Sequence, residues 1–260
     1  MRRCAQPLVR LFVIVLVAGP AVTLAADRAP LRIAVAASAA PALRLIASQY
    51  EASGGDNVVL AVGSTGSLYT QIVNGAPFDL YLAADMARPV RAVKERRAAP
   101  GIHAVAYARG VLAAWIPDSR CRPDCMAALD TLDGRLAIAD PVLAPYGVAA
   151  VACLHARNFN NRPTVVAPNV GVAFQYVASG NAPGGLVALS QLRLGEEAGR
   201  VKRADYSMVA PDCHPSLLQG AVVLRGPHRK AAESFLHYLL GPVSRKVFTR
   251  FGFRVPPDSP

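Results

Sequence analysis

Two short turns combine hydroxyl side chains with the start of a helical pattern. The first turn is Ala36-Ala37-Ser38-Ala39-Ala40-Pro41, the second is Gly63-Ser64-Thr65-Gly66-Ser67, and each follows an apolar run typical of a buried strand. The first turn of a helix presents unpaired backbone N–H groups and a partial positive charge, so a small oxyanion can bind there without a cationic side chain. Hydroxyl groups can donate to the same anion. These residues predict anion capture by neutral donors.

The chain around these turns alternates strand-like and helix-like segments, which is typical of an α/β protein with mostly parallel sheets. The expected strands cover residues 31–36, 57–62, 79–83, 111–116, 136–139, 164–166, 185–188, 200–206 and 219–224. The expected helices cover residues 41–50, 67–73, 85 to about 97, 148–156, 172–178, 230–240 and 242–251. Each helix begins at a turn, and Asn169 is well placed to cap one of them.

The first 26 residues have the pattern of a secretory signal peptide. Arg2 and Arg3 precede an apolar stretch over residues 11–22, and the small residues Ala25 and Ala26 follow it. A Gly-Pro pair interrupts the apolar stretch, which argues against a retained membrane-spanning helix. We therefore expect export to the periplasm and a mature chain that begins near residue 27.

The charge balance is basic but gives no sign of a nucleic-acid face. The formal net charge is +11, and loss of Arg2, Arg3 and Arg10 with the signal peptide leaves +8. Lysines and arginines are scattered and do not alternate with aromatic residues, so we expect no nucleic-acid partner. A solvated basic surface or a weak steering field for anions accounts for the excess. The mature length suits one large domain or two lobes.

Four cysteines remain in the mature chain, and an oxidising compartment favours disulfides. Cys121 and Cys125 could close a small surface loop, which leaves Cys153 and Cys213 for a second bridge. Three connectivities are possible, so the pairing stays open here. The neighbouring histidines His155 and His214 do not complete the paired spacing of a structural zinc site, so we expect no metal cation.

Longer stretches resemble the periplasmic molybdate-binding proteins of ABC importers in content, order and spacing. In the first half of the chain the resemblance rests on Ser38, the turn over residues 63–68 and the run over residues 71–85. In the second half it rests on residues 139–141, 145–147, 181–185, 238–242 and 250–253. The resemblance covers nearly the whole mature chain.

This resemblance implies an α/β protein with the two-lobed type II fold of periplasmic binding proteins, each lobe a mixed, mostly parallel sheet flanked by helices. Residues 27–108 with 217–260 are expected to form the first lobe, and residues 109–216 the second. The implied function is capture of molybdate or tungstate between the lobes and delivery to the permease and ATPase subunits of an ABC importer. The implied protein is a monomer without a cofactor.

Carried over position by position, the resemblance implies four oxyanion-binding residues. Ser38 and Thr65 would donate through their hydroxyls from the first lobe. Tyr146 and Val170 would donate backbone N–H groups from the second lobe. Each charge-assisted hydrogen bond contributes roughly 1.5–3 kcal/mol, so several are needed to offset dehydration of a dianion.

One position departs from the family pattern. Where molybdate binders often carry a tyrosine whose hydroxyl reaches the ligand, this chain has Ala188. The site then works with one hydrogen bond fewer, or a water or Ser190 replaces the missing donor, or the ligand differs. Ser64 and Ser67 also compete with Thr65 for the role of hydroxyl donor.

The other polar residues near these motifs receive structural interpretations. Asp79 and Asp85 are expected to be strand-end and capping residues, because a carboxylate would repel a dianion. The alternative functions are a binding protein for another oxyanion or a small organic anion, a relative that has lost binding, and a secreted hydrolase.

A hydrolase is the weakest of these interpretations. It would need an activated nucleophile, but the Gly-x-Ser-x-Gly elbow does not occur around Ser38, Ser64 or Ser67. Cys153 with His155 is a possible nucleophile pair, yet export favours oxidation of that thiol. We therefore expect no enzymatic activity.

Overall fold

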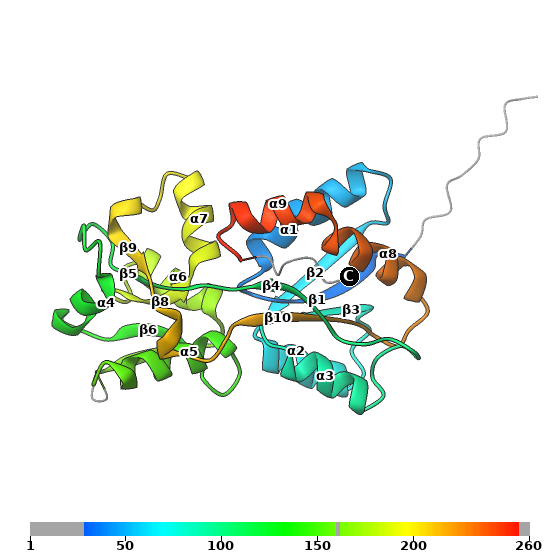
Figure 1. Cartoon of the computed structure of the whole chain (residues 1–260), viewed down its shortest axis with the longest axis horizontal. Coiled ribbons are helices and arrows are strands. Elements are labelled where there is room, and N and C mark those ends of the chain that lie inside the picture. The colour runs from blue at the N-terminus through cyan, green and yellow to red at the C-terminus, as the bar shows by residue number, and fades with distance from the viewer. Residues whose placement is uncertain (1–28, 160–161, 255–260) are drawn as a thin grey trace, which may run out of the picture.

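The computed structural model describes residues 29–159 and 162–254, so the expected signal peptide over residues 1–26 lies outside the described residues. The described chain forms two five-stranded sheets, each flanked by helices. We call the elements around the first sheet lobe 1 and those around the second lobe 2 (Figure 1). The expected two-lobed α/β architecture is confirmed.

The sheet of lobe 1 has the strand order β2-β1-β3-β10-β4, and only β10 runs antiparallel to its neighbours. Alternate residues of β1 point to opposite faces, as expected for a strand, so Ile33 packs on one side and Ala34 on the other. Helices α1, α8 and α9 cover the first face, and α2 and α3 the second. The elements are β1 (Leu31–Ala36), α1 (Ala40–Ala52), β2 (Val58–Gly63), α2 (Thr65–Val73), β3 (Leu80–Ala83), α3 (Ala87–Lys94), β4 (Val105–Arg109), β10 (Leu218–Val223), α8 (Arg229–Leu240) and α9 (Pro242–Arg250).

The sheet of lobe 2 repeats this plan with the order β7-β6-β8-β5-β9, in which β5 is the antiparallel strand. Helices α4 and α5 pack on one face of this sheet, and α6 and α7 on the other. The elements are β5 (Leu112–Trp115), α4 (Cys125–Ala128), β6 (Leu136–Ala139), α5 (Pro145–Ala156), β7 (Thr164–Ala167), α6 (Val170–Ala178), β8 (Gly185–Ala188), α7 (Leu189–Glu197) and β9 (Tyr206–Met208). Short 3₁₀ turns cover Leu129–Thr131, Arg203–Asp205 and Pro211–Cys213.

The chain crosses between the sheets twice, from β4 to β5 and back from β9 to β10. The two crossing segments lie side by side, and the N–H of Gly110 donates to the carbonyl oxygen of Leu217 at 2.9 Å. A side chain at position 110 has no room, because an added Cβ would lie 2.1 Å from the Tyr146 hydroxyl. The exact lobe boundaries stay a prediction.

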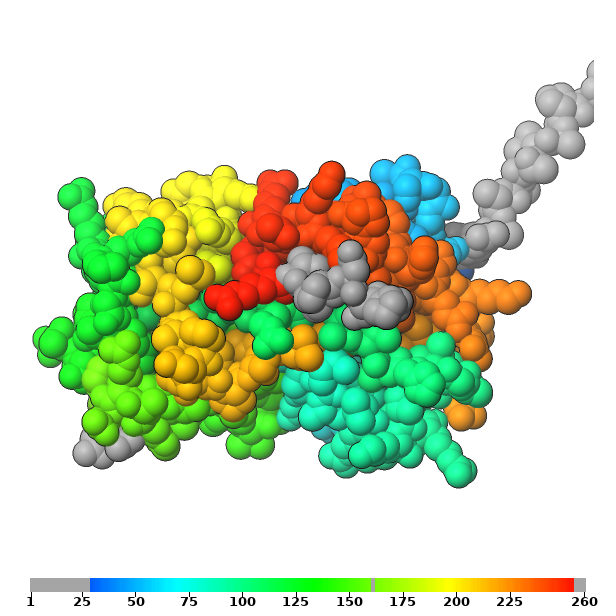
Figure 2. Space-filling view, in the orientation of Figure 1, coloured from blue at the N-terminus to red at the C-terminus, as the bar shows by residue number. Residues whose placement is uncertain are grey.

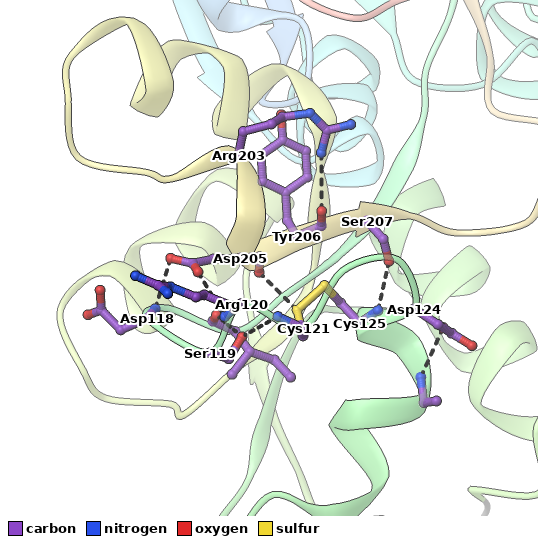
Figure 3. Close-up of a disulfide and its surroundings, with 12 residues drawn as sticks. Asp118, Ser119, Arg120, Cys121, Asp124, Cys125, Arg203, Asp205, Tyr206 and Ser207 are labelled. Carbon is purple, nitrogen blue, oxygen red and sulfur yellow. Dashed lines mark hydrogen bonds between the residues drawn. A yellow bond between two sulfur atoms is a disulfide. The ribbon is translucent and has the colours of Figure 1, made fainter.

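Both disulfides of lobe 2 are formed, Cys121–Cys125 and Cys153–Cys213. The structure thus selects one of the three connectivities, the one built on the local pair. Asp205 holds the chain that leads to the first disulfide, since its carboxylate accepts the N–H of Asp118 at 2.9 Å and of Arg120 at 3.0 Å (Figure 3). Both donors have positive φ angles, so the buried carboxylate stabilises a backbone turn that non-glycine residues rarely adopt.

The expected strand over residues 200–206 is wrong. The structure has a 3₁₀ turn at Arg203–Asp205 and begins β9 only at Tyr206. The carboxylate of Asp205 bonds to the neighbouring loop, and β9 pairs with β5 from Tyr206 onward. Three elements, β4, α4 and α7, were absent from the expected set. None of the helices that the structure describes has the length and hydropathy required to cross a membrane.

Candidate functional site

Four helix starts meet between the two lobes. Ser38 lies in the turn between β1 and α1, and Thr65 is the first residue of α2. Tyr146 lies in the first turn of α5, and Val170 is the first residue of α6. All four are buried, with 1–3% of their surface exposed. The helices α2, α5 and α6 begin two or three residues before their expected starts, which moves these residues from the preceding turns into the helices themselves.

The turn after β1 packs directly against lobe 2. The Ser190 hydroxyl donates to the carbonyl oxygen of Ser38 at 2.6 Å, and the Gln191 side-chain amide donates to the carbonyl oxygen of Ala37 at 2.9 Å. The start of α6 approaches the same turn, since a Cβ added at Gly171 would lie 3.5 Å from the Cβ of Ala37. Ser38 and Val170 are thereby brought into one region.

The start of α2 makes the second contact with lobe 2. The Gly66 N–H donates to the carbonyl oxygen of Leu143 at 2.7 Å, and glycine favours this close approach because a Cβ would make a tight contact of 3.0 Å with the same oxygen. Arg88 binds Asp85 at 2.6 Å and donates to the carbonyl oxygen of Val142 at 3.3 Å. Thr65 is thereby placed beside the loop that leads into α5.

A third contact between the lobes lies outside the site. Arg250 at the end of α9 makes two hydrogen bonds to the Glu197 carboxylate at the end of α7, at 2.7 and 2.9 Å. The red end of α9 lies beside the yellow segment of lobe 2 in the space-filling view (Figure 2). Together with the buried contacts, this ion pair defines a closed arrangement of the lobes.

The backbone amides of the four site residues are unpaired. Within residues 29–159 and 162–254, no hydrogen bond is made by the N–H of Ser38, Thr65, Tyr146 or Val170. Helix starts leave such donors free, and each carries part of the positive end of the helix dipole. Four separate helix starts thus supply unpaired N–H groups to one buried region.

The two hydroxyls expected to bind the anion both accept a hydrogen bond from lobe 1. The Thr65 hydroxyl oxygen accepts the Ala84 N–H at 3.0 Å. The Ser38 hydroxyl oxygen accepts the Gln219 amide at 3.3 Å, and Tyr107 fixes that amide by donating to its carbonyl oxygen at 2.9 Å. The Thr65 hydroxyl therefore still has its own proton to donate, whereas the Ser38 hydroxyl also interacts with the Tyr146 phenol.

The Tyr146 side chain reaches the same place as its backbone. Its hydroxyl interacts with the Ser38 hydroxyl, the Gln219 amide and the backbone of Val111. Burial raises the pKa of the Tyr146 phenol far above its usual range, and these hydrogen-bond partners only partly offset that rise. The phenol therefore stays protonated at neutral pH and can act as a donor.

Ser64, Ser67 and Ser190, the alternative hydroxyl donors, make hydrogen bonds within the protein. Ser64 caps α2 by accepting the Ser67 N–H, and its own hydroxyl donates to the Ser67 hydroxyl at 2.7 Å. The Ser190 hydroxyl donates its proton to the carbonyl oxygen of Ser38, so it does not replace the donor missing at Ala188. The remaining hydroxyl competitors of Thr65 therefore serve the helix cap.

The carboxylates of Asp79 and Asp85 make contacts that stabilise the fold. Asp79 accepts the Arg32 N–H at 2.8 Å and lies 3.1 Å from the Nδ1 atom of His228. Asp85 accepts the Arg88 N–H near the start of α3 at 2.9 Å. Among the residues that the structure describes, no group of three or more His, Cys, Asp or Glu side chains could hold a metal ion.

The sequence analysis did not identify two side chains of the site, those of Tyr146 and Gln219. The Tyr146 side chain was passed over because only its backbone was assigned a role, and Gln219 because it stood in an expected strand. Gln219 is fully buried, and a buried amide needs hydrogen-bond partners, but nothing in the neighbouring sequence identifies Ser38 as one of them.

Comparison with known proteins identifies the family to which the chain belongs. Residues 31–254 match the family model described as bacterial extracellular solute-binding protein. The chain is 35% identical over 224 residues to the molybdate-binding protein ModA of Rhodobacter capsulatus, covering 85% of this chain and 86% of that protein. It is 36% identical over 234 residues to ModA of Azotobacter vinelandii, covering 88% and 91%.

The solved structures include the periplasmic molybdate-binding protein of Azotobacter vinelandii, which superimposes with a TM-score of 0.77 at 30% sequence identity. That match covers 87% of this chain and 100% of the other. The resemblance to periplasmic molybdate-binding proteins is thereby confirmed. The chain belongs to the family of bacterial extracellular solute-binding proteins.

Proposed function

We propose that this chain captures molybdate between its lobes and delivers it to the permease and ATPase subunits of an ABC importer. One observation carries the proposal: four unpaired backbone N–H groups and the Ser38 and Thr65 hydroxyls occupy one buried region between the lobes. The names of the relatives at 35–36% identity support the choice of ligand. We further propose that the protein acts in the periplasm as a monomer, after removal of residues 1–26.

The proposed oxyanion ligands are the Ser38 and Thr65 hydroxyls and the backbone amides of Tyr146 and Val170. All of these groups donate and carry no formal charge, so a fully deprotonated tetrahedral anion satisfies them better than a protonated one. Fixed donors on four rigid elements also favour one anion radius over another. Tungstate, which has the same charge and shape as molybdate, is the second proposed ligand.

Isothermal titration calorimetry of the mature protein with molybdate, tungstate, sulfate and phosphate tests this function. We expect binding of the first two anions and at least tenfold weaker binding of the others, equivalent to about 1.4 kcal/mol. Recovery of unchanged molybdate after incubation accompanies the measurement, because we propose no catalysis. Folded protein that gives no heat with molybdate or tungstate contradicts the proposal.

Removing either site hydroxyl is expected to weaken molybdate binding. Ser38→Ala and Thr65→Ala each delete one hydrogen bond to a charged ligand, so each should cost about 1–3 kcal/mol of binding free energy. The matched control is Ser244→Ala, which removes a buried hydroxyl bonded to the Tyr238 carbonyl oxygen in lobe 1. Unchanged affinity in both site variants, with the fold intact, would show that the site has been misplaced.

We also propose that the Tyr146 phenol supplies the hydroxyl that Ala188 lacks. Its interactions with Ser38 and Gln219 support this role, and its protonated state makes it a donor. Tyr146→Phe keeps the backbone amide and is expected to weaken molybdate binding by about 1–3 kcal/mol. Calorimetry and a thermal melt separate two roles for the phenol: a lower melting temperature with unchanged affinity would assign it to packing alone.

A further inference from the structure

A pocket lies in lobe 1 beside the N-terminal end of β1, whereas Ser38 follows the C-terminal end of this strand. Its volume is about 420 Å³. Four segments form its walls, namely residues 29–32 at the start of β1, 75–79 after α2, 96–97 after α3 and 224–228 after β10. The six residues of β1 separate it from Ser38 by about 20 Å, so it is distinct from the site between the lobes.

Four arginines line this pocket: Arg32, Arg96, Arg97 and Arg225. In the described part of the chain, none of their guanidinium groups makes a hydrogen bond or an ion pair. Glu95 is nearby, but its carboxylate already binds Tyr69 and Arg91. Arg97 lies close enough to Glu95 to help lower the pKa of that carboxyl, but it forms no ion pair with it. Four guanidinium groups without an ion-pair partner therefore leave an excess of positive charge around one pocket.

The only acid among the described residues that line the pocket is Asp79, and both of its oxygens are in use. One accepts the backbone N–H of Arg32 and the other contacts His228. Asp79 therefore neutralises none of the arginine side chains directly. With His228 neutral, the lining side chains carry a formal charge of +3, from four arginines and one aspartate.

Backbone contacts position the segments that carry three of these arginines. The Arg225 N–H donates to the carbonyl oxygen of Arg97 at 2.8 Å, which joins two walls of the pocket. Arg96 has a φ angle of 56°, a left-handed conformation that non-glycine residues rarely adopt. A backbone hydrogen bond thus holds the two segments that carry Arg96, Arg97 and Arg225 beside each other.

We propose that this pocket binds a multiply charged phosphate group. A guanidinium presents a planar fork of donors that matches phosphate oxygens, and several forks around one cavity suit an anion of charge −2 or −3. The donors between the lobes are neutral, whereas this pocket uses cations. The two sites therefore select different anions, and the second site does not depend on the first.

Calorimetry with inorganic pyrophosphate at about 150 mM salt, where the Debye length is about 8 Å, tests the proposal on the mature protein. We expect one binding site, weakened at least tenfold in the double variant Arg97→Ala/Arg225→Ala. The matched control is Arg44→Ala/Arg135→Ala, which removes the same charge from two exposed arginines outside the pocket. Ser38→Ala should leave pyrophosphate binding unchanged, because it alters only the site between the lobes.

The result is decisive in either direction. Absence of pyrophosphate binding, equal weakening in the two double variants, or weakening by Ser38→Ala would overturn the proposal. Vesicles containing phosphatidic acid, whose headgroup is a phosphomonoester that can carry two negative charges, identify the source of the phosphate. If the wild-type protein sediments with the vesicles and the Arg97→Ala/Arg225→Ala variant does not, the phosphate belongs to a lipid headgroup. If the wild-type protein binds pyrophosphate but does not sediment with the vesicles, the phosphate belongs to a soluble compound.

Discussion

Replacing Cys153 and Cys213 by alanine is expected to lower the free energy of unfolding of lobe 2 by about 4 kcal/mol. This disulfide joins residues 60 positions apart, and cross-linking a longer loop removes more conformational entropy from the unfolded chain. It also ties α5 to the segment that returns toward lobe 1. Denaturant unfolding without added oxidant or reductant measures this loss of unfolding free energy.

The second disulfide provides the control. Cys121 and Cys125 are only four positions apart, so the same double replacement there should cost about 2 kcal/mol. Fluorescence of Trp115 reports the transition, because this is the one tryptophan of the chain and it is buried in lobe 2 against Phe174. Equal losses for the two pairs would contradict an origin in loop length.

Gly147→Ala is expected to abolish most of the affinity for molybdate. A Cβ at this position would lie 2.4 Å from the carbonyl oxygen of Ala139 and 2.6 Å from the carbonyl carbon of Asp140. Both neighbours are backbone atoms, so the start of α5 must move away from β6. Tyr146 would then lose the position of both its amide and its phenol, a loss of about 3 kcal/mol or more, which is a hundredfold in affinity.

Calorimetry with molybdate measures this loss, and a thermal melt shows whether the variant still folds. Gly226→Ala is the control, since a Cβ there meets nothing closer than 3.7 Å. Wild-type affinity in the folded Gly147→Ala protein would show that the position of α5 does not limit binding.

Much of the fold could be predicted because local pattern and tertiary structure agree. The strands at residues 31–36, 136–139 and 185–188 have the expected bounds, and each is an apolar run ended by turn residues. The helix starts were less accurate. Tyr146 and Val170 were placed in turns before their helices, yet the helices already begin at Pro145 and Val170.

The missed elements depend on partners far away in the sequence. Strand β4 pairs in the sheet only with β10, which lies more than a hundred residues later in the chain. Strand β9 is three residues long and is defined by pairing with β5. A local pattern cannot specify such edge strands, because what stabilises them is the neighbouring strand.

In the candidate site, too, local patterns could be predicted from the sequence and long-range contacts could not. The hydroxyl turns at Ser38 and Thr65 have a recognisable local pattern, and the resemblance supplied Tyr146 and Val170. The contact between Gln219 and Ser38 joins residues 181 positions apart, and no local pattern points to it. The Tyr146 phenol also needed the fold, because its partners come from the turn after β1 and from the crossing segments.

The contacts that hold the lobes together have a consequence for ligand affinity. The bonds from Gly66 to Leu143, from Ser190 to Ser38 and from Arg250 to Glu197 join lobe to lobe. Each one stabilises the closed form whether or not an anion is present. The apparent dissociation constant equals the intrinsic one divided by the fraction of molecules that can bind. Arg250 and Glu197, which lie outside the site, can therefore adjust affinity without touching the anion. Substitutions at such positions would change uptake while leaving selectivity unchanged.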